Sequence, residues 1–171
     1  MKILPHSFFQ RKTLVVAPEL LGKILVRKIG NKIIREKITE VEAYIGPHDL
    51  ASHSSKGRTK RTEAMHAPGG TIYVYFIYGM YFMLNIVTEE KDHPSGILIR
   101  STEKVIGPGR VAREFKIDKS LYGKKLGRKT GLWIEDGEKL ARKKILRTPR
   151  IGVDYAKEWA KKPYRFVLID P

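Results

Sequence analysis

An aromatic and β-branched run, residues 71–87, constrains the fold more than any other segment. Its sequence is TIYVYFIYGMYFMLNIV, with the pair Tyr78-Gly79 near the middle. Such residues favour strands, and a glycine between two strand-like runs favours a tight turn, so we expect a β-hairpin. Two further β-rich runs, residues 23–29 and 32–44, flank Gly30-Asn31 and predict a second hairpin with a two-residue turn.

The helical segments are expected to be short. Thr13 is the expected N-cap of a helix over residues 14–21, with Pro18 near its first turn, where proline is tolerated. Asp154 is the expected N-cap of another helix, over residues 155–162.

The remaining segments complete one domain. A helix is expected to begin at Gly107-Pro108-Gly109, and further strands are expected at residues 96–101, 132–135, 144–147 and 164–169. Residues 50–70 are polar and basic, and long loops of this kind are often functional. With no internal repeat and no linker, we expect one α+β domain over residues 1–171: mainly antiparallel strands, a protruding β-hairpin and a few short helices.

The charge of the chain indicates a polyanionic partner. The sequence holds 34 lysines and arginines against 18 aspartates and glutamates, a net charge of +16. A field of that sign favours nucleic acid, whereas a lysine-rich surface of the thermophilic kind would show a closer balance of acids and bases. With no cysteine, no apolar signal-peptide core and no apolar run long enough for a membrane span, we expect a cytoplasmic, intracellular protein, nuclear in a eukaryote.

An acidic strand end is the first candidate site. Glu40, Glu42 and Tyr44 alternate along one expected strand and therefore share one face. Two carboxylates beside a polar loop suit acid–base chemistry, but the spacing alone slightly favours an exposed strand edge whose acidic residues offset nearby lysines. His48-Asp49 and His53 follow closely and could form a metal site with a glutamate, although their spacing matches no established metal pattern.

Aromatic and basic residues form the other candidates. Most aromatic side chains of a β-hairpin belong to the core, yet Tyr78 lies next to Gly79 at the expected turn. An aromatic residue at a hairpin tip can wedge between stacked bases, and Tyr73 and Tyr75, on one strand face, could stack on an extruded base. The basic clusters suit phosphate contacts; they include Arg58, Lys60 and Arg61, residues 110–116, residues 124–129, and Arg142-Lys143-Lys144.

Two segments of this chain, EAYIGP at residues 42–47 and YVYFIYGMYF at residues 73–82, are specific when they occur together. ASHS at residues 51–54, Asn85, LIR at 98–100, GPG at 107–109, RIGV at 150–153 and EWA at 158–160 follow in order. From about Leu14 to Phe166 the chain resembles the alkyladenine (3-methylpurine) DNA glycosylase family.

The resemblance implies a base-excision repair enzyme that binds duplex DNA and extrudes a damaged purine. Tyr78 would fill the gap left in the duplex, and Tyr44, His53 and Tyr75 would surround the flipped base. Asn85 would lie at the pocket floor, where its amide opposes the exocyclic amino group of normal guanine.

The resemblance also implies the chemistry. Glu42 would be the general base for the attacking water, with Arg100 holding that water or a neighbouring phosphate and the Ile151 backbone completing the water site. Glu40 would be a supporting or a surface residue. The product would be an abasic site and the enzyme a monofunctional hydrolase, with no cofactor and no metal. A monomer is expected because a search along DNA needs no symmetry. Independently of the resemblance, the basic clusters make Arg58, Lys60, Arg61 and Arg110 the expected phosphate contacts.

Other functions stay open at this level. A non-catalytic nucleic-acid-binding protein fits the charge and size, and a metal-dependent nuclease could use Glu40, Glu42, Asp49 and His53. A Schiff-base lysine that nicks the strand is a further alternative to activated water. The resemblance does not choose among 3-methyladenine, 7-methylguanine, hypoxanthine and ethenoadenine. The loop over residues 61–70 departs from the family pattern at Glu63 and His66, which bears on its DNA contacts.

Overall fold

A computed structural model describes residues 1–137 and 144–169 of the chain. Of the predicted basic cluster Arg142-Lys143-Lys144, the first two residues lie outside the described part. The architecture is a curled antiparallel sheet with a few short helices, which confirms the predicted α+β class.

Both predicted hairpins are confirmed. Strands β1 (Ile24–Ile29) and β2 (Lys32–Tyr44) pair antiparallel, with Ile29 opposite Lys32 across the Gly30-Asn31 turn. Strands β3 (Ile72–Ile77) and β4 (Tyr81–Thr88) pair in the same way, with Ile77 opposite Tyr81.

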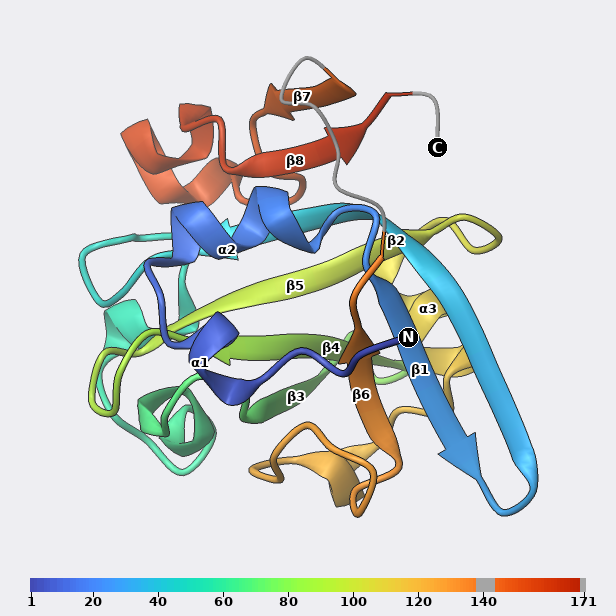
Figure 1. Cartoon of the computed structure of the whole chain (residues 1–171). Helices are drawn as coiled ribbons and strands as arrows, with labels where there is room; N and C mark the ends of the chain where they lie inside the picture. The colour runs from blue at the N-terminus through green and yellow to red at the C-terminus, as the bar shows by residue number, and fades with distance from the viewer. Residues whose placement is uncertain (138–143, 170–171) are drawn as a thin grey trace.

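The long strand β2 organises the sheet (Figure 1). The strand order is β3-β4-β5-β2-β1-β6, where β5 is Ser95–Thr102 and β6 is Leu132–Glu135. One edge of β2 pairs with β5; the other pairs first with β1 and then, over Glu40 to Glu42, with β8 (Arg165–Leu168). Strand β7 (Ile145–Thr148) pairs with β8 at the end of the molecule away from the β1–β2 turn.

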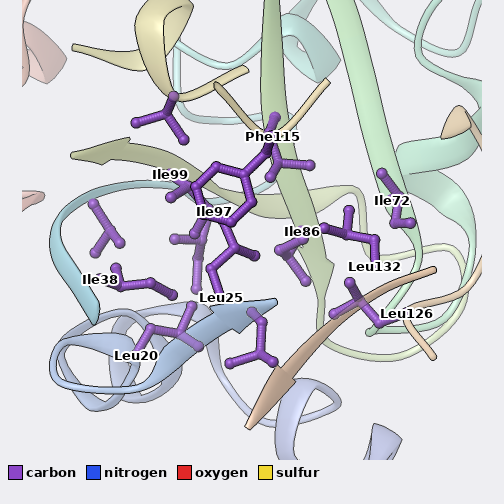
Figure 2. Packing of buried hydrophobic residues seen from close by; sticks show 14 of the residues in the cluster. Leu20, Leu25, Ile38, Ile72, Ile86, Ile97, Ile99, Phe115, Leu126 and Leu132 are labelled. Atoms are coloured by element: carbon purple, nitrogen blue, oxygen red, sulfur yellow. The ribbon is translucent and has the colours of Figure 1, made fainter. Parts of the chain in front are cut away.

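One hydrophobic cluster fills the inside of the curled sheet (Figure 2). Alternate side chains of the strands enter it, as the period of two along a strand requires. Helix α2 (Thr13–Leu20) packs on β2 and β5, and helix α3 (Pro108–Glu114) packs on β4 and β5. The labelled members of the cluster lie in α2, in the strands, directly after α3 and in the loop before β6: Leu20, Leu25, Ile38, Ile72, Ile86, Ile97, Ile99, Phe115, Leu126 and Leu132.

Two predicted helix caps are wrong. Thr13 is the first residue of α2, the N-cap is Lys12, and the Thr13 hydroxyl donates to the Glu89 carboxylate at 2.6 Å. Pro18 therefore lies inside the helix and not in its first turn. The Thr13 hydroxyl bonds to Glu89, which is distant in the sequence, and does not cap the helix.

The last helical segment also differs from the prediction. The 3₁₀ segment η5 (Asp154–Lys161) begins at Asp154, after Val153, and no side chain caps it. Its backbone leaves the helical region at Ala156 and Lys157, so it consists of two turns joined by a kink.

Short helical turns make up the rest of the fold. They are α1 (His6–Phe9), η1 (His53–Lys56), η2 (Glu63–His66) and η3 (Lys119–Leu121). Turns η1 and η2 lie within the segment predicted as a long polar loop. In the described ranges, 1–137 and 144–169, no helix is long and apolar enough to cross a membrane.

Candidate active site

The sheet face opposite the core lines a cavity. On β3, Ile72 and Val74 enter the hydrophobic cluster, whereas Tyr73, Tyr75 and Ile77 line the cavity. The same alternation continues onto the neighbouring strands, which contribute Met83, Asn85 and Val87 from β4 and Gly96, Leu98 and Arg100 from β5. The predicted shared face of Tyr73 and Tyr75 is confirmed, and Phe76 lies on the other face, exposed to solvent.

Two loop segments close the sides of this cavity. Residues 51–53, which follow β2, line one part, and residues 151–153 with Tyr155 line another. The enclosed volume is about 330 Å³. Pockets of roughly 300–1,000 Å³ are typical of small-molecule sites, so the cavity can accept a group of the size of a nucleobase.

Glu42 lies directly behind the cavity wall, with no exposed surface. Its Oε1 accepts a hydrogen bond from the Ile151 backbone N–H at 2.8 Å and lies 3.3 Å from Arg100 Nη1. Its Oε2 accepts from the Tyr44 hydroxyl at 2.8 Å. All three neighbouring residues line the cavity, so the groups that contact the carboxylate are the groups that a ligand would meet.

Tyr44 is held as a hydrogen-bond donor. Burial, followed by the negative charge of Glu42, raises the pKa of the Tyr44 hydroxyl well above its usual value. Burial likewise raises the pKa of Tyr75. Both hydroxyls therefore keep their protons at neutral pH, and the cavity wall presents neutral, electron-rich rings.

His53 and the two β3 tyrosines form an aromatic corner. The His53 ring meets the Tyr75 ring edge-to-face at 4.5 Å between centroids, and His53 Nδ1 lies 2.9 Å from the Tyr73 hydroxyl. Burial, then the charges of Arg61 and Lys56, lowers the pKa of His53 to about 4. The imidazole is therefore neutral at physiological pH.

Asn85 and Tyr78 both line the cavity, the first buried and the second exposed. The Asn85 amide is buried on β4 and donates weakly, at 3.4 Å, to the backbone carbonyls of Tyr73 and Met83. Tyr78 is 80% exposed at the β3–β4 turn and still contributes to the cavity lining. An exposed aromatic side chain thus stands beside a cavity lined by aromatic rings.

The family model for methylpurine-DNA glycosylase matches residues 7–171, nearly the whole chain. The chain belongs to the methylpurine-DNA glycosylase family. The predicted resemblance is confirmed, and the protein is accordingly a DNA glycosylase for alkylated bases that acts in DNA repair.

Relatives from distant organisms agree with this family. A Legionella pneumophila protein is 45% identical and covers 99% of this chain and 96% of its own length. Proteins of Methanocella arvoryzae and Bdellovibrio bacteriovorus are each 42% identical, over 97% and 98% of this chain. All three are provisionally named 3-methyladenine DNA glycosylase.

A buried ion pair in this glycosylase was not predicted as such. Arg150 donates to Asp49 through both terminal nitrogens, at 2.5 and 2.8 Å, and both side chains are fully buried. Arg150 also donates to the Ala43 carbonyl and lies over the Tyr44 ring. Ile151, whose backbone N–H donates to Glu42, directly follows Arg150 in the chain, so the pair fixes the residue next to this contact. The sequence contained a hint in the recurring segments EAYIGP-x-D and RIGV, but no local pattern connects them.

Two carboxylates of the hypothetical metal site are already paired with arginines. Asp49 pairs with Arg150, and Glu40 pairs with Arg100 and Arg165. In the parts of the chain that the structure describes, no three His, Asp or Glu side chains gather closely enough to hold a metal ion. Asp49 and Glu40 serve instead as anchors for arginines, and His53 bonds to the Tyr73 hydroxyl.

The proposed phosphate contacts differ in their surroundings. Arg58 donates to both Glu63 oxygens and to Asp92, so its charge is already compensated. Arg61 lies with its guanidinium 5.6 Å from the Tyr75 ring centroid, at the edge of the aromatic corner. Lys60 and Arg110 are exposed.

Proposed function

We propose that this glycosylase hydrolyses the N-glycosidic bond of an alkylated purine that it extrudes from duplex DNA. The observation that carries the proposal is the buried Glu42 carboxylate, whose bonded neighbours Tyr44, Arg100 and Ile151 all line the cavity. A water molecule between this carboxylate and the bound nucleotide would transfer its proton to Glu42 as it attacks the sugar carbon. A placed carboxylate base contributes about 10²–10⁴-fold in rate.

The cavity suits a flipped, positively charged base. Methylation at N3 or N7 makes the purine cationic and a good leaving group, so positioning supplies much of what catalysis needs. The neutral faces of Tyr44 and Tyr75 attract such a ring by ~0.5–2 kcal/mol. Extrusion costs a few kcal/mol and least for weakly paired bases, which contributes to selection.

Three cavity features support the remaining assignments. Tyr78 would occupy the space that the extruded nucleotide leaves, because it is more exposed than Tyr155, the other exposed aromatic residue in the cavity lining. Asn85 would oppose the exocyclic amino group of normal guanine from the floor. His53 would pack an edge against the base while staying neutral. The partner would be double-stranded DNA inside the cell, bound by a monomer.

The decisive experiment is the release of free bases from methylated duplex DNA, without added metal. Wild-type protein should release methylated purines. Glu42→Gln should lower the rate of release by at least ~10²-fold and leave the affinity for DNA unchanged. Glu36→Gln is the matched control, since Glu36 is a buried, hydrogen-bonded carboxylate on the same strand and does not line the cavity. Tight, salt-sensitive binding without release would identify a non-catalytic DNA-binding protein instead.

The product distinguishes water from a lysine nucleophile. A monofunctional enzyme leaves an intact strand that breaks only after alkali or heat. Spontaneous nicks, or a covalent complex trapped by borohydride, would require a Schiff-base lysine and would contradict the assignment of Glu42 as the base for water.

A further inference from the structure

One guanidinium lies between two carboxylates on the same face of β2. Arg100 Nε donates to Glu40 Oε1 at 3.1 Å, and Arg100 Nη1 lies 3.3 Å from Glu42 Oε1. Glu40 therefore competes with Glu42 for the same cation. A guanidinium and a carboxylate form their strongest pair when both oxygens are bound side by side, an arrangement that the present sharing prevents.

A double irregularity in the β2–β5 pairing creates this arrangement. Glu40 lies opposite Ser101, and the next residue of β2, Val41, lies opposite Ile99. Arg100 is thus the extra residue of a β-bulge, and bulges redirect a side chain relative to the regular pleat. The register shift on the other side of Glu40 completes the local bend.

Glu40 is itself firmly held. It is buried, and its carboxylate accepts from Ser101 Oγ at 2.6 Å and from Arg165 Nε at 2.6 Å. Burial alone would raise the pKa of Glu40, but the hydrogen bonds from Ser101 and Arg165 and the charges of Arg100 and Arg165 lower it. Glu40 does not line the cavity, so it acts on a ligand only through its neighbours.

We propose that Glu40 is a positioning residue that holds Arg100 partly away from Glu42 and so keeps Glu42 able to accept a proton. The inference rests on the proposed function, in which Glu42 is the base for water. Without Glu40, the freed guanidinium would close onto Glu42 as a bidentate pair and occupy the oxygen lone pairs that the water needs. The loss of a neighbouring negative charge would favour the ionised form of Glu42 further.

The charged and titratable groups around the two carboxylates are few. Glu42 faces Tyr44 on its own strand, Arg100 on β5 and Tyr75 on β3. Glu40 faces Arg100 and also Arg165 on β8. Because burial raises the pKa of both tyrosines, neither loses its proton near neutral pH. His53, which packs on Tyr75 and has a pKa of about 4, also titrates in the acid range, but no variant below alters its contacts. A difference in the pH dependence of excision between these variants and the wild type would therefore report on the carboxylates.

The first test is Glu40→Gln, assayed by single-turnover excision from methylated duplex DNA across pH. We expect the plateau rate to fall about tenfold to a hundredfold, the cost of slightly misplaced catalytic groups, with DNA affinity unchanged. We also expect the acid limb of the pH–rate profile to move to lower pH. A merely structural role would lower stability or rate without moving this limb, and an unmoved limb overturns the proposal.

A second variant should move the same limb in the opposite direction. Arg165→Gln removes the other cation from Glu40, which then draws Arg100 away from Glu42, so the acid limb should move to higher pH. Arg165 is partly exposed, and this variant decides the question if Glu40→Gln does not fold. A shift to lower pH in Arg165→Gln would overturn the proposal.

A matched control separates burial from position. Glu135 is a buried carboxylate bound by Arg35 and by the Trp133 indole, on β6, and does not line the cavity. Glu135→Gln should lower stability and leave the acid limb unchanged. A limb that moves in this control as it does in Glu40→Gln would show a non-specific effect and overturn the inference.

A titration of the free protein keeps this inference separable from the proposed function. Carbon-13 NMR can follow the titration of the Glu42 carboxyl, whose signal is assigned with Glu42→Gln. Relative to the wild type, the titration midpoint should move to lower pH in Glu40→Gln and to higher pH in Arg165→Gln. If wild-type protein releases no bases, the proposed function fails, and the carboxyl titration still tests the control of Glu42 by Glu40. If bases are released and the two variants titrate like wild type, this inference alone fails.

Discussion

His53 and Tyr73 share a hydrogen bond whose direction follows from their surroundings. The Tyr73 hydroxyl also interacts with the Arg61 guanidinium, which can only donate, so the Tyr73 proton is directed to His53 Nδ1. His53 then carries its own proton on Nε2. The neutral ring leaves the positive charge in the cavity to the substrate, as an alkylated purine requires.

The stability of the protein should report on this neutral histidine. The pKa of His53 is about 4 in the folded state, below its value of 6.5 in model compounds, so between these pH values only the unfolded chain takes up the proton. The contribution of the neutral His53 to the free energy of unfolding is complete above pH 6.5 and is lost as the pH falls towards 4. Urea unfolding should show this decline, and His53→Gln should flatten it. An imidazole that titrates near pH 6.5 by NMR would contradict the assignment.

The β3–β4 hairpin turn is strained at the residue that carries its proposed function. Tyr78 and Gly79 both have positive φ, 54° and 66°, and the Met80 N–H donates to the Ile77 carbonyl across the turn. Glycine adopts this conformation freely, whereas a tyrosine there costs roughly 1–2 kcal/mol. Such strain is often retained where a side chain has a function.

Tyr78→Gly should therefore separate stability from DNA capture. Relief of backbone strain should leave the melting temperature unchanged or raised, while affinity for methylated duplex falls more than affinity for undamaged duplex. Fluorescence anisotropy on both duplexes and a thermal melt measure these effects. Ile33→Ser, at an exposed apolar position of the other hairpin, is the control and should change neither affinity. Equal loss on both duplexes would mean that Tyr78 does not fill the gap.

The Asp49–Arg150 ion pair connects two distant segments of the chain that both line the cavity. It joins the loop after β2 to the segment before η5, which lie far apart along the chain. Removing one partner of a buried ion pair leaves an uncompensated charge and typically costs about 3–5 kcal/mol.

Asp49→Asn should lower the free energy of unfolding by about that amount and also reduce excision, because Ile151 loses its anchor. Asp92→Asn, at an exposed ion pair with Arg58, should cost at most about 1 kcal/mol. Urea titrations of both variants measure the difference. Equal, small effects would show that the buried pair does not fix the cavity wall.

The net charge of +16 predicts strongly salt-dependent DNA binding. Each lost phosphate contact should reduce the slope of log affinity against log salt by about one. We expect Arg110→Gln to do so, whereas Arg58→Gln, whose charge Glu63 and Asp92 already compensate, should change the slope less. The reverse order would place the phosphate backbone on the Arg58 side of the molecule.

Local pattern predicted much of this fold and part of the site. The hairpins at Gly30-Asn31 and Tyr78-Gly79 follow from turn chemistry, and the shared face of Tyr73 and Tyr75 follows from the strand period. The roles of Glu42 and its neighbours came instead from resemblance to a family. The cap predictions at Thr13 and Asp154 failed because a local rule could not include Glu89 or the backbone kink in η5.

The sequence by itself determined the strands, the turns and the positive field, since these depend on neighbouring residues and on a sum of charges. Only the tertiary structure decided which charges meet. Arg100 reaches both Glu40 and Glu42 because of a β-bulge, and Arg150 finds Asp49 across most of the chain. Such contacts depend on strand register and on the path of the whole backbone, which the spacing of residues along the chain does not specify.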